Sequence, residues 1–212
     1  VLAADLTVQL GAHRPGKGGA LVQLAHEAAS ITRSRLKYLA MVEGELKECF
    51  AEMTGDREIP SLEYDFSFKI DRSTAEDVKK CEEAFLSRLM SSHEREIAAG
   101  ATLWGIHKDD VDIRLNGKSA RLYASQGQQR SLALGLKLSE SRISMRDTGE
   151  EPVLLLDDVF SELDATRREY LTERMKRGQV IMTACGDVDL GTSVNVINVE
   201  KGKYGVKTPT AF

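Results

Sequence analysis

Cysteine is scarce in this chain, and its few copies stand far apart. The three cysteines, Cys49, Cys81 and Cys185, lack the short spacings that bind zinc, and their odd number does not suit a disulfide framework. Scattered free thiols are typical of a reducing compartment. The cysteine pattern therefore argues against a secreted disulfide scaffold or a zinc module, and it predicts free thiols in a cytoplasmic protein.

Long apolar runs and an excess of basic residues are also missing. No apolar run approaches the roughly 20 residues of a membrane-spanning helix, and no signal-peptide pattern is visible. The net charge of −4 gives no overall positive field that would attract nucleic acid. Any DNA-binding surface must then be local or built by an assembly. With 212 residues, of which 42% are hydrophobic, the chain is long enough for one or two domains with a core.

A complete phosphate-binding P-loop is missing as well. Residues 11–17 give the spacing of Gly, four residues, Gly and Lys, but Gly18 stands where Ser or Thr should supply a hydroxyl for Mg²⁺. We therefore interpret residues 11–19 as a flexible loop and expect no true Walker A motif. Because the chain also starts at Val1 instead of Met, we expect it to be part of a longer protein.

An apolar run that ends in two carboxylates is the first sign of chemistry. Pro152–Leu156 is typical of a short strand buried on both faces of a parallel sheet, and Asp157 and Asp158 follow at once. Ligands of open α/β sheets lie beyond the carboxyl ends of the strands. A carboxylate there can hold Mg²⁺ beside a triphosphate, and a second can orient an attacking water. Alternatively, the two Asp residues only end a strand, as acidic residues often do.

A polar turn precedes the helix predicted over residues 130–145. Ser125 can cap this helix, and Gly127 lets a ligand approach the backbone closely. Free N–H groups and the positive end of the helix dipole favour an anion at such a place. Residues 125–129 therefore indicate a phosphate contact, although most turns of this kind are only caps.

The first hundred residues have a helical pattern. Apolar residues at three- and four-residue steps predict a long helix over residues 20–53, with Leu24, Ala28, Ile31, Tyr38, Val42, Leu46, Cys49 and Met53 on its buried face. A half-exposed strand is expected over 62–68, and a second helix, capped by Ser73 or Thr74, over residues to about 98. The two helices can pair antiparallel as an arm. We divide the chain into a helical arm, 1–100, and a head, 101–212; a plain helical subdomain remains the alternative to an arm.

Turn signals organise the rest of the head. Asn116-Gly117 predicts a hairpin between strands 111–115 and 120–123, because this pair suits a type I′ turn. A helix over 165–176 and a strand over 179–183 should follow. A second hairpin is expected over 194–207, with its turn at Lys201-Gly202.

Three segments in this order resemble the RecF family of ABC-type ATPases. They are GATLWGIHKDDVDIRLNGKSARLYA before the signature, SQGQQRSLALGLKLSE at the signature, and VLLLDDVFSELDATRR over Walker B and the D-loop. The family usually has Pro and Arg where this chain has Ile106 and Lys108, which leaves the role of His107 open. The resemblance implies an α/β fold, with a partial P-loop NTPase core sheet, helices and an α-helical arm, and it covers the part that follows the Walker A lobe.

The resemblance also implies roles for individual residues. Asp157 would be the Mg²⁺ carboxylate, Asp158 the catalytic base, and Thr183 the residue at the switch position. Ser161 and Asp164 would lie at the dimer seam. The signature residues would contact the γ-phosphate of ATP held by the other subunit: Ser125, Gln126, Gly127, Gln128 and Gln129.

The family function that the resemblance implies is recombinational DNA repair and replication restart within the response to DNA damage (SOS response). It implies ATP and Mg²⁺ as cofactors, an ATP-dependent homodimer, DNA that is single-stranded or a gapped duplex, and mediators of the RecO and RecR type, with no membrane. Without a true Walker A motif, the 212 residues alone should not hydrolyse ATP; the intact protein should be a weak ATPase. The alternatives are another SMC-like ABC head and a non-catalytic helical interaction module.

Overall fold

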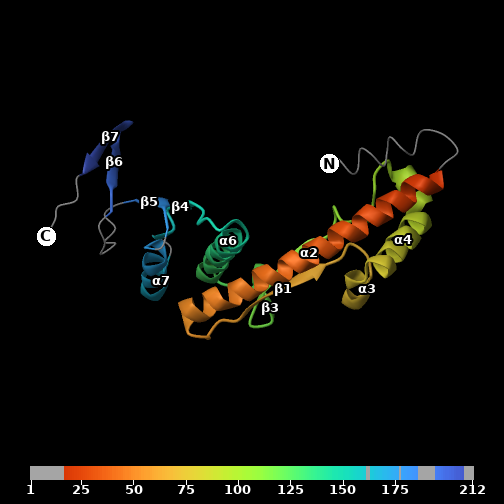
Figure 1. The fold of residues 1–212 in the computed structure, drawn as a ribbon, viewed down its shortest axis with the longest axis horizontal. Helices are drawn as coiled ribbons and strands as arrows, with labels where there is room; N and C mark the ends of the chain where they lie inside the picture. Colours follow the sequence, from red (N-terminus) through yellow and green to blue (C-terminus); the bar gives the residue numbers. More distant parts are fainter. Residues whose placement is uncertain (1–16, 161–162, 177, 186–193, 208–212) are drawn as a thin grey trace.

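The computed structural model describes residues 17–160, 163–176, 178–185 and 194–207. Its elements, labelled as in Figure 1, are α2 (Lys17–Thr54), β1 (Pro60–Asp65), α3 (Arg72–Glu76), α4 (Val78–Ala99), β2 (Asp110–Leu115), β3 (Lys118–Ser119), α5 (Ala120–Tyr123), α6 (Gln126–Thr148), β4 (Leu154–Asp157), α7 (Ala165–Met175), β5 (Val180–Thr183), β6 (Val196–Glu200) and β7 (Lys203–Lys207). Of the near P-loop, residues 11–16 lie outside the described ranges, and Lys17 opens α2.

Helix α2 is the longest of the described helices, and it runs from the α4 end of the molecule to the α7 end (Figure 1). Its 38 residues extend over about 57 Å at 1.5 Å per residue. The N-terminal half runs antiparallel to α4, where Ala25, Ala28 and Ala29 pack with Phe85 and neighbouring apolar side chains. The C-terminal half packs on α6 and the head. One helix therefore joins both parts, and the division at residue 100 stays a prediction.

The buried face of α2 differs from the predicted one. Ile31 and Tyr38 were expected inside, but they are 40% and 45% exposed, whereas Thr32 and Leu36 are buried. The first part of the contact line follows the alanines that pack against α4. Further along, Leu36 packs against Tyr64 of β1 and Ala75 of α3. The later positions of the predicted face, Val42, Leu46, Cys49 and Met53, are buried as expected.

The second long helix is divided in two by an aspartate. Ser73 or Thr74 was expected to cap one helix, but Asp71 caps α3 by accepting from the Thr74 backbone N–H at 2.9 Å. Asp77 then caps α4 by accepting from the N–H groups of the next residues. The prediction was wrong because an Asp carboxylate two or three residues earlier satisfies the free N–H groups first. The buried stripe at Cys81, Phe85 and Leu89 is confirmed.

A three-stranded antiparallel sheet of order β1-β2-β3 covers the middle of α2. Asn116 and Gly117 both have positive φ, 51° and 76°, which confirms the predicted turn. The expected strand over 120–123 is wrong, because β3 is only Lys118–Ser119 and the chain then coils into α5. The burial of β1 alternates as predicted for a half-exposed strand.

The head has a parallel pair of strands, β4 and β5, with α6 and α7 on one face. Leu156 is buried in this core, but Leu155 is 74% exposed. The prediction of a strand buried on both faces was therefore wrong for the described residues, in which helices cover one face of β4. The hairpin β6–β7 forms a separate two-stranded sheet, and Lys201 and Gly202 make its turn with φ of 49° and 76°.

The three cysteines are free thiols, as predicted, with Cys49 and Cys81 buried and Cys185 exposed. In the described ranges, no helix combines the length and the apolar character that crossing a membrane requires.

Candidate nucleotide site

The carboxyl ends of β4 and β5 bring Asp157 beside Thr183. The two residues are partners in the parallel register. The Thr183 hydroxyl donates a hydrogen bond to Asp157 Oδ1. The backbone N–H of Asp158 approaches the Thr183 carbonyl at 3.2 Å and the Thr183 hydroxyl oxygen at 3.1 Å. The predicted carboxylates and the predicted switch residue therefore occupy one edge of the sheet.

Asp158 leaves the strand in a left-handed conformation with φ of 47°. Few residues other than glycine adopt this region, and Asp is among those that tolerate it. The turn separates two consecutive carboxyl groups into different environments: Asp157 is exposed and Asp158 is partly buried. One carboxylate is thus open to a cation and water, while its neighbour is partly sheltered.

The start of α6 is held by a complete capping box. Ser125 Oγ accepts from the Gln128 backbone N–H at 3.3 Å, and Gln128 Oε1 accepts from the Ser125 N–H at 2.9 Å. The Gln129 N–H already donates to the Ser125 carbonyl at 2.9 Å. The first N–H groups of a helix have no acceptor within it, so those of Gln126 and Gly127 remain for a ligand.

The same helix end is open to an anion. Ser125, Gln126 and Gln129 are exposed, and a Cβ added at Gly127 would meet nothing within 4 Å. Because Ser125 Oγ accepts from Gln128, its own O–H proton remains for another acceptor. Gln129 differs from its neighbours, since its side-chain amide donates to the Ala124 carbonyl at 3.1 Å.

Asp164 caps α7 and pairs with Arg167. Its Oδ1 accepts from the Arg167 backbone N–H at 2.9 Å, and its Oδ2 accepts from Arg167 Nη1 at 2.5 Å. The Arg167 backbone N–H and guanidinium lower the pKa of the Asp164 carboxyl, against a smaller opposing effect of burial. The other predicted seam residue, Ser161, lies outside the described residues.

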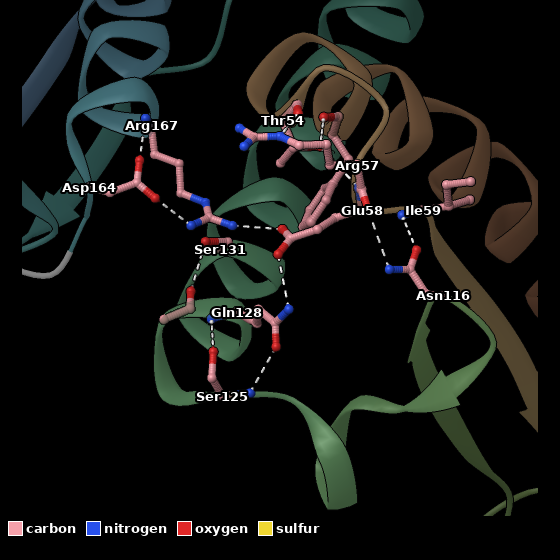
Figure 2. A network of polar contacts seen from close by, with 12 residues as sticks. Thr54, Arg57, Glu58, Ile59, Asn116, Ser125, Gln128, Ser131, Asp164 and Arg167 are labelled. Atoms are coloured by element: carbon pink, nitrogen blue, oxygen red, sulfur yellow. Dashed lines mark hydrogen bonds and ion pairs between the residues drawn. The ribbon is translucent and has the colours of Figure 1, made fainter.

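Sequence reasoning missed Glu58, which lies between these two helix starts (Figure 2). Its Oε1 accepts from Gln128 Nε2 at 3.0 Å, and its Oε2 accepts from Arg167 Nη2 at 2.6 Å. No local pattern marks a glutamate in the short turn after a helix. Only the tertiary fold brings it to Arg167, 109 residues further along the chain.

His107 is exposed, in the loop between α4 and β2. Its Nε2 lies 3.3 Å from the Thr102 carbonyl, a contact that stabilises the local turn.

Among the residues that the structure describes, no group of three or more His, Cys, Asp or Glu side chains is placed to hold a metal ion. The exposed carboxylate of Asp157 still suits Mg²⁺, which commonly keeps one or two protein carboxylates and fills its other positions with phosphate oxygens and water.

The comparisons with known proteins point to one family. Among curated proteins, the DNA replication and repair protein RecF of Ruminiclostridium cellulolyticum is 40% identical over 170 residues, which are 80% of this chain and 45% of that protein. This chain is a RecF homologue. The RecF protein of Staphylococcus aureus strain Newman is 36% identical over 179 residues. The chain spans about half the length of the curated RecF proteins it matches, at 45% and 48%.

Solved structures agree with the sequence relationship. The structure described as the recombination mediator protein RecF-ATP in the RecFOR pathway superimposes with a TM-score of 0.76 and 30% identity, over 91% of this chain and 50% of that RecF chain. A comparison with protein-family models found no match. The predicted RecF relationship and the mixed α/β ABC-type fold are confirmed, whereas the roles of the single site residues stay predictions.

Proposed function

We propose that this chain is the part of a RecF-type protein that supplies the signature helix and the Walker B edge to an ATP-gated, DNA-binding dimer. Its RecF relatives are named for DNA replication and repair, and a solved RecF neighbour contains ATP. The observation that carries the proposal is the pairing of Asp157 with Thr183 at the carboxyl edge of a parallel sheet. Ligand sites of open α/β sheets lie at this edge.

Asp157 is the proposed Mg²⁺ ligand, and Asp158 the proposed base. When bound, Mg²⁺ supplies charge stabilisation to the triphosphate. Asp158 orients the attacking water and accepts its proton from a partly sheltered position. Thr183 holds both carboxylate residues in place. Its hydroxyl donates to the Asp157 carboxylate and lies 3.1 Å from the backbone nitrogen of Asp158.

The helix end at Ser125 is the proposed contact to ATP held by a second copy. The Ser125 hydroxyl and the N–H groups of Gln126 and Gly127 bind the γ-phosphate, since a helix N-terminus favours an anion. Gln128 and Gln129 hold the turn through their amide bonds. Ser161 and Asp164 lie at the seam between the copies.

ATP then acts as a bridge whose binding energy favours the closed dimer. The proposed partners are DNA with single-strand gaps, as single strand or gapped duplex, and mediators of the RecO and RecR type. The proposed role is recombinational repair, in which the dimer binds beside a gap and helps to load the recombinase.

Sedimentation of the full gene product, with and without ATP, Mg²⁺ and gapped DNA, tests the proposal. We expect ATP to convert monomers to dimers, and Ser125→Arg to block dimers while each subunit still binds ATP. ATP-dependent dimers of Ser125→Arg would exclude the contact in trans. The 212 residues alone should show no Mg²⁺-dependent ATPase activity, and a robust rate would contradict the split site.

A further inference from the structure

The carboxylate of Glu58 joins two helix starts that the sequence places far apart. One oxygen accepts from Gln128 at the start of α6 at 3.0 Å, and the other accepts from Arg167 in the first turn of α7 at 2.6 Å. The side chains of Glu58 and Arg167 are only 15% and 16% exposed. Charged groups this far from water interact more strongly than a surface pair.

The bonds form an unbroken series, which Figure 2 shows. The Ser125 N–H donates to Gln128 Oε1, and Gln128 Nε2 donates to Glu58. Arg167 donates to Glu58 through one guanidinium nitrogen and to Asp164 through another, at 2.5 Å. The amide of Gln128 can point in only one direction, because its oxygen must accept from Ser125 while its nitrogen donates to Glu58.

The turn that carries Glu58 is itself anchored. The Ile59 N–H donates to Asn116 Oδ1 at 2.8 Å, and the Asn116 N–H donates back to the Ile59 carbonyl at 2.8 Å. On the other side of Glu58, Arg57 Nε donates to the Thr54 carbonyl at 2.8 Å. The turn is therefore bonded both to the end of α2 and to the β2–β3 hairpin. A movement of either element also moves Glu58.

We propose that Glu58 and Arg167 are positioning residues that make the Ser125 helix end and the Asp164 cap move as one unit. This inference rests on the proposed contact in trans, in which Ser125 meets ATP and Asp164 lies at the seam. Because Glu58 belongs to the turn after α2, a shift of α2 reaches both halves of that surface together. The surface therefore closes on a second copy only when the series is intact.

Glu58→Gln in the full gene product tests this role. In this variant the new side-chain amide nitrogen faces a donor in either orientation, Gln128 Nε2 or Arg167 Nη2. One of the two bonds that Glu58 accepts is therefore lost. We expect the Kd of the ATP-dependent dimer to rise about tenfold, a size that coupling within one hydrogen-bond network commonly reaches. ATP binding by a single subunit should keep its Kd. The matched control is Glu63→Gln, which breaks an exposed ion pair to Arg114 of 2.7 Å and should change neither value.

Hydrogen–deuterium exchange without nucleotide gives an independent readout. Glu58→Gln should raise exchange at the start of α6 and at the start of α7 together, and Glu63→Gln at neither. Exchange that rises at one helix start alone, or a parallel loss of ATP binding and dimerisation, would overturn the positioning role. If the unaltered protein did not dimerise with ATP, the proposed function would fall, and exchange alone would decide whether Glu58 couples the two helix starts.

Discussion

Thr183 ends β5 beside Asp157 at the end of β4, and its hydroxyl donates to the Asp157 carboxylate. The oxygen of that hydroxyl lies 3.1 Å from the N–H of Asp158. One side chain therefore touches both residues of the acidic pair, from a strand 26 positions further along the chain. From this arrangement we predict that Thr183 orients the acidic pair.

Removing the Thr183 hydroxyl should distinguish a role in orienting Asp157 and Asp158 from a role in binding ATP. Thr183→Val keeps the shape of the side chain and the preference for a strand, so the loss is confined to the hydrogen bonds. We expect the free energy of unfolding to fall by about 1 kcal/mol and ATP turnover of the full gene product to fall with little change in ATP affinity. Urea denaturation and steady-state kinetics measure the two effects. Thr183→Ser should restore turnover, and a turnover that Thr183→Val leaves unchanged would remove Thr183 from the site.

Asp158→Asn tests the proposed base. Asn tolerates the left-handed φ of 47° at this position, so the fold should remain. Loss of a general base commonly lowers a rate by about 10²–10⁴-fold, and we expect a drop of this size in turnover with ATP binding intact. The ATP-bound dimer should then accumulate, which sedimentation detects. Normal turnover in the variant would show that another group accepts the proton.

Local signals in the sequence were sufficient to predict turns and caps, where one or two residues determine the backbone conformation. Asn116-Gly117 and Lys201-Gly202 turn with positive φ as predicted, and Ser125 caps α6. These positions could be predicted because turn and cap preferences arise from each residue's own sterics and hydrogen bonding.

Predictions that depended on neighbours from other elements were less accurate. Tyr38 is exposed and Leu36 buried because Leu36 lies against Tyr64 of β1 and Ala75 of α3, two partners from other elements. Leu155 is exposed because described helices cover only one face of β4. Glu58 could not be found at all, since its two partners come from distant parts of the chain.

The Asp164–Arg167 pair predicts a pH-dependent difference in stability. The folded protein holds the pKa of Asp164 below its usual value, chiefly through the Arg167 backbone N–H and also through its guanidinium. A lowered pKa means that the stabilisation is present above the unfolded pKa of about 3.9 and is lost as pH falls through the folded pKa. Asp164→Asn keeps a capping oxygen but loses the charge, so it should be less stable than the unaltered chain at pH 7.

Denaturation of both proteins at a series of pH values measures this difference. The gap should be constant from pH 7 to about 5 and should shrink below about pH 4, where the Asp164 carboxyl becomes protonated first in the unfolded chain and then, at lower pH, in the folded protein. Asp65→Asn on the exposed end of β1 serves as the control. A gap that stayed constant down to pH 2 would mean that the charge of Asp164 contributes nothing.

Two glycines inside helices should respond in opposite directions to alanine. A Cβ at Gly135 of α6 would lie 2.8 Å from the Phe50 ring and 2.9 Å from Leu46 of α2, whereas a Cβ at the exposed Gly44 of α2 would meet nothing within 4 Å. Gly135→Ala should therefore destabilise the chain by about 1–3 kcal/mol through overpacking, although alanine is the better helix former. Gly44→Ala should stabilise it by about 0.5–1 kcal/mol.

Urea denaturation of both variants measures the contrast within one protein. Because both substitutions add the same methyl group to a helix, their difference isolates the contact between α6 and α2. Gly135→Ser should also destabilise the chain, since its Cβ meets the same two side chains. If Gly135→Ala were as stabilising as Gly44→Ala, then α6 would not lie against Leu46 and Phe50, and the packing that carries the signature helix on α2 would be wrong.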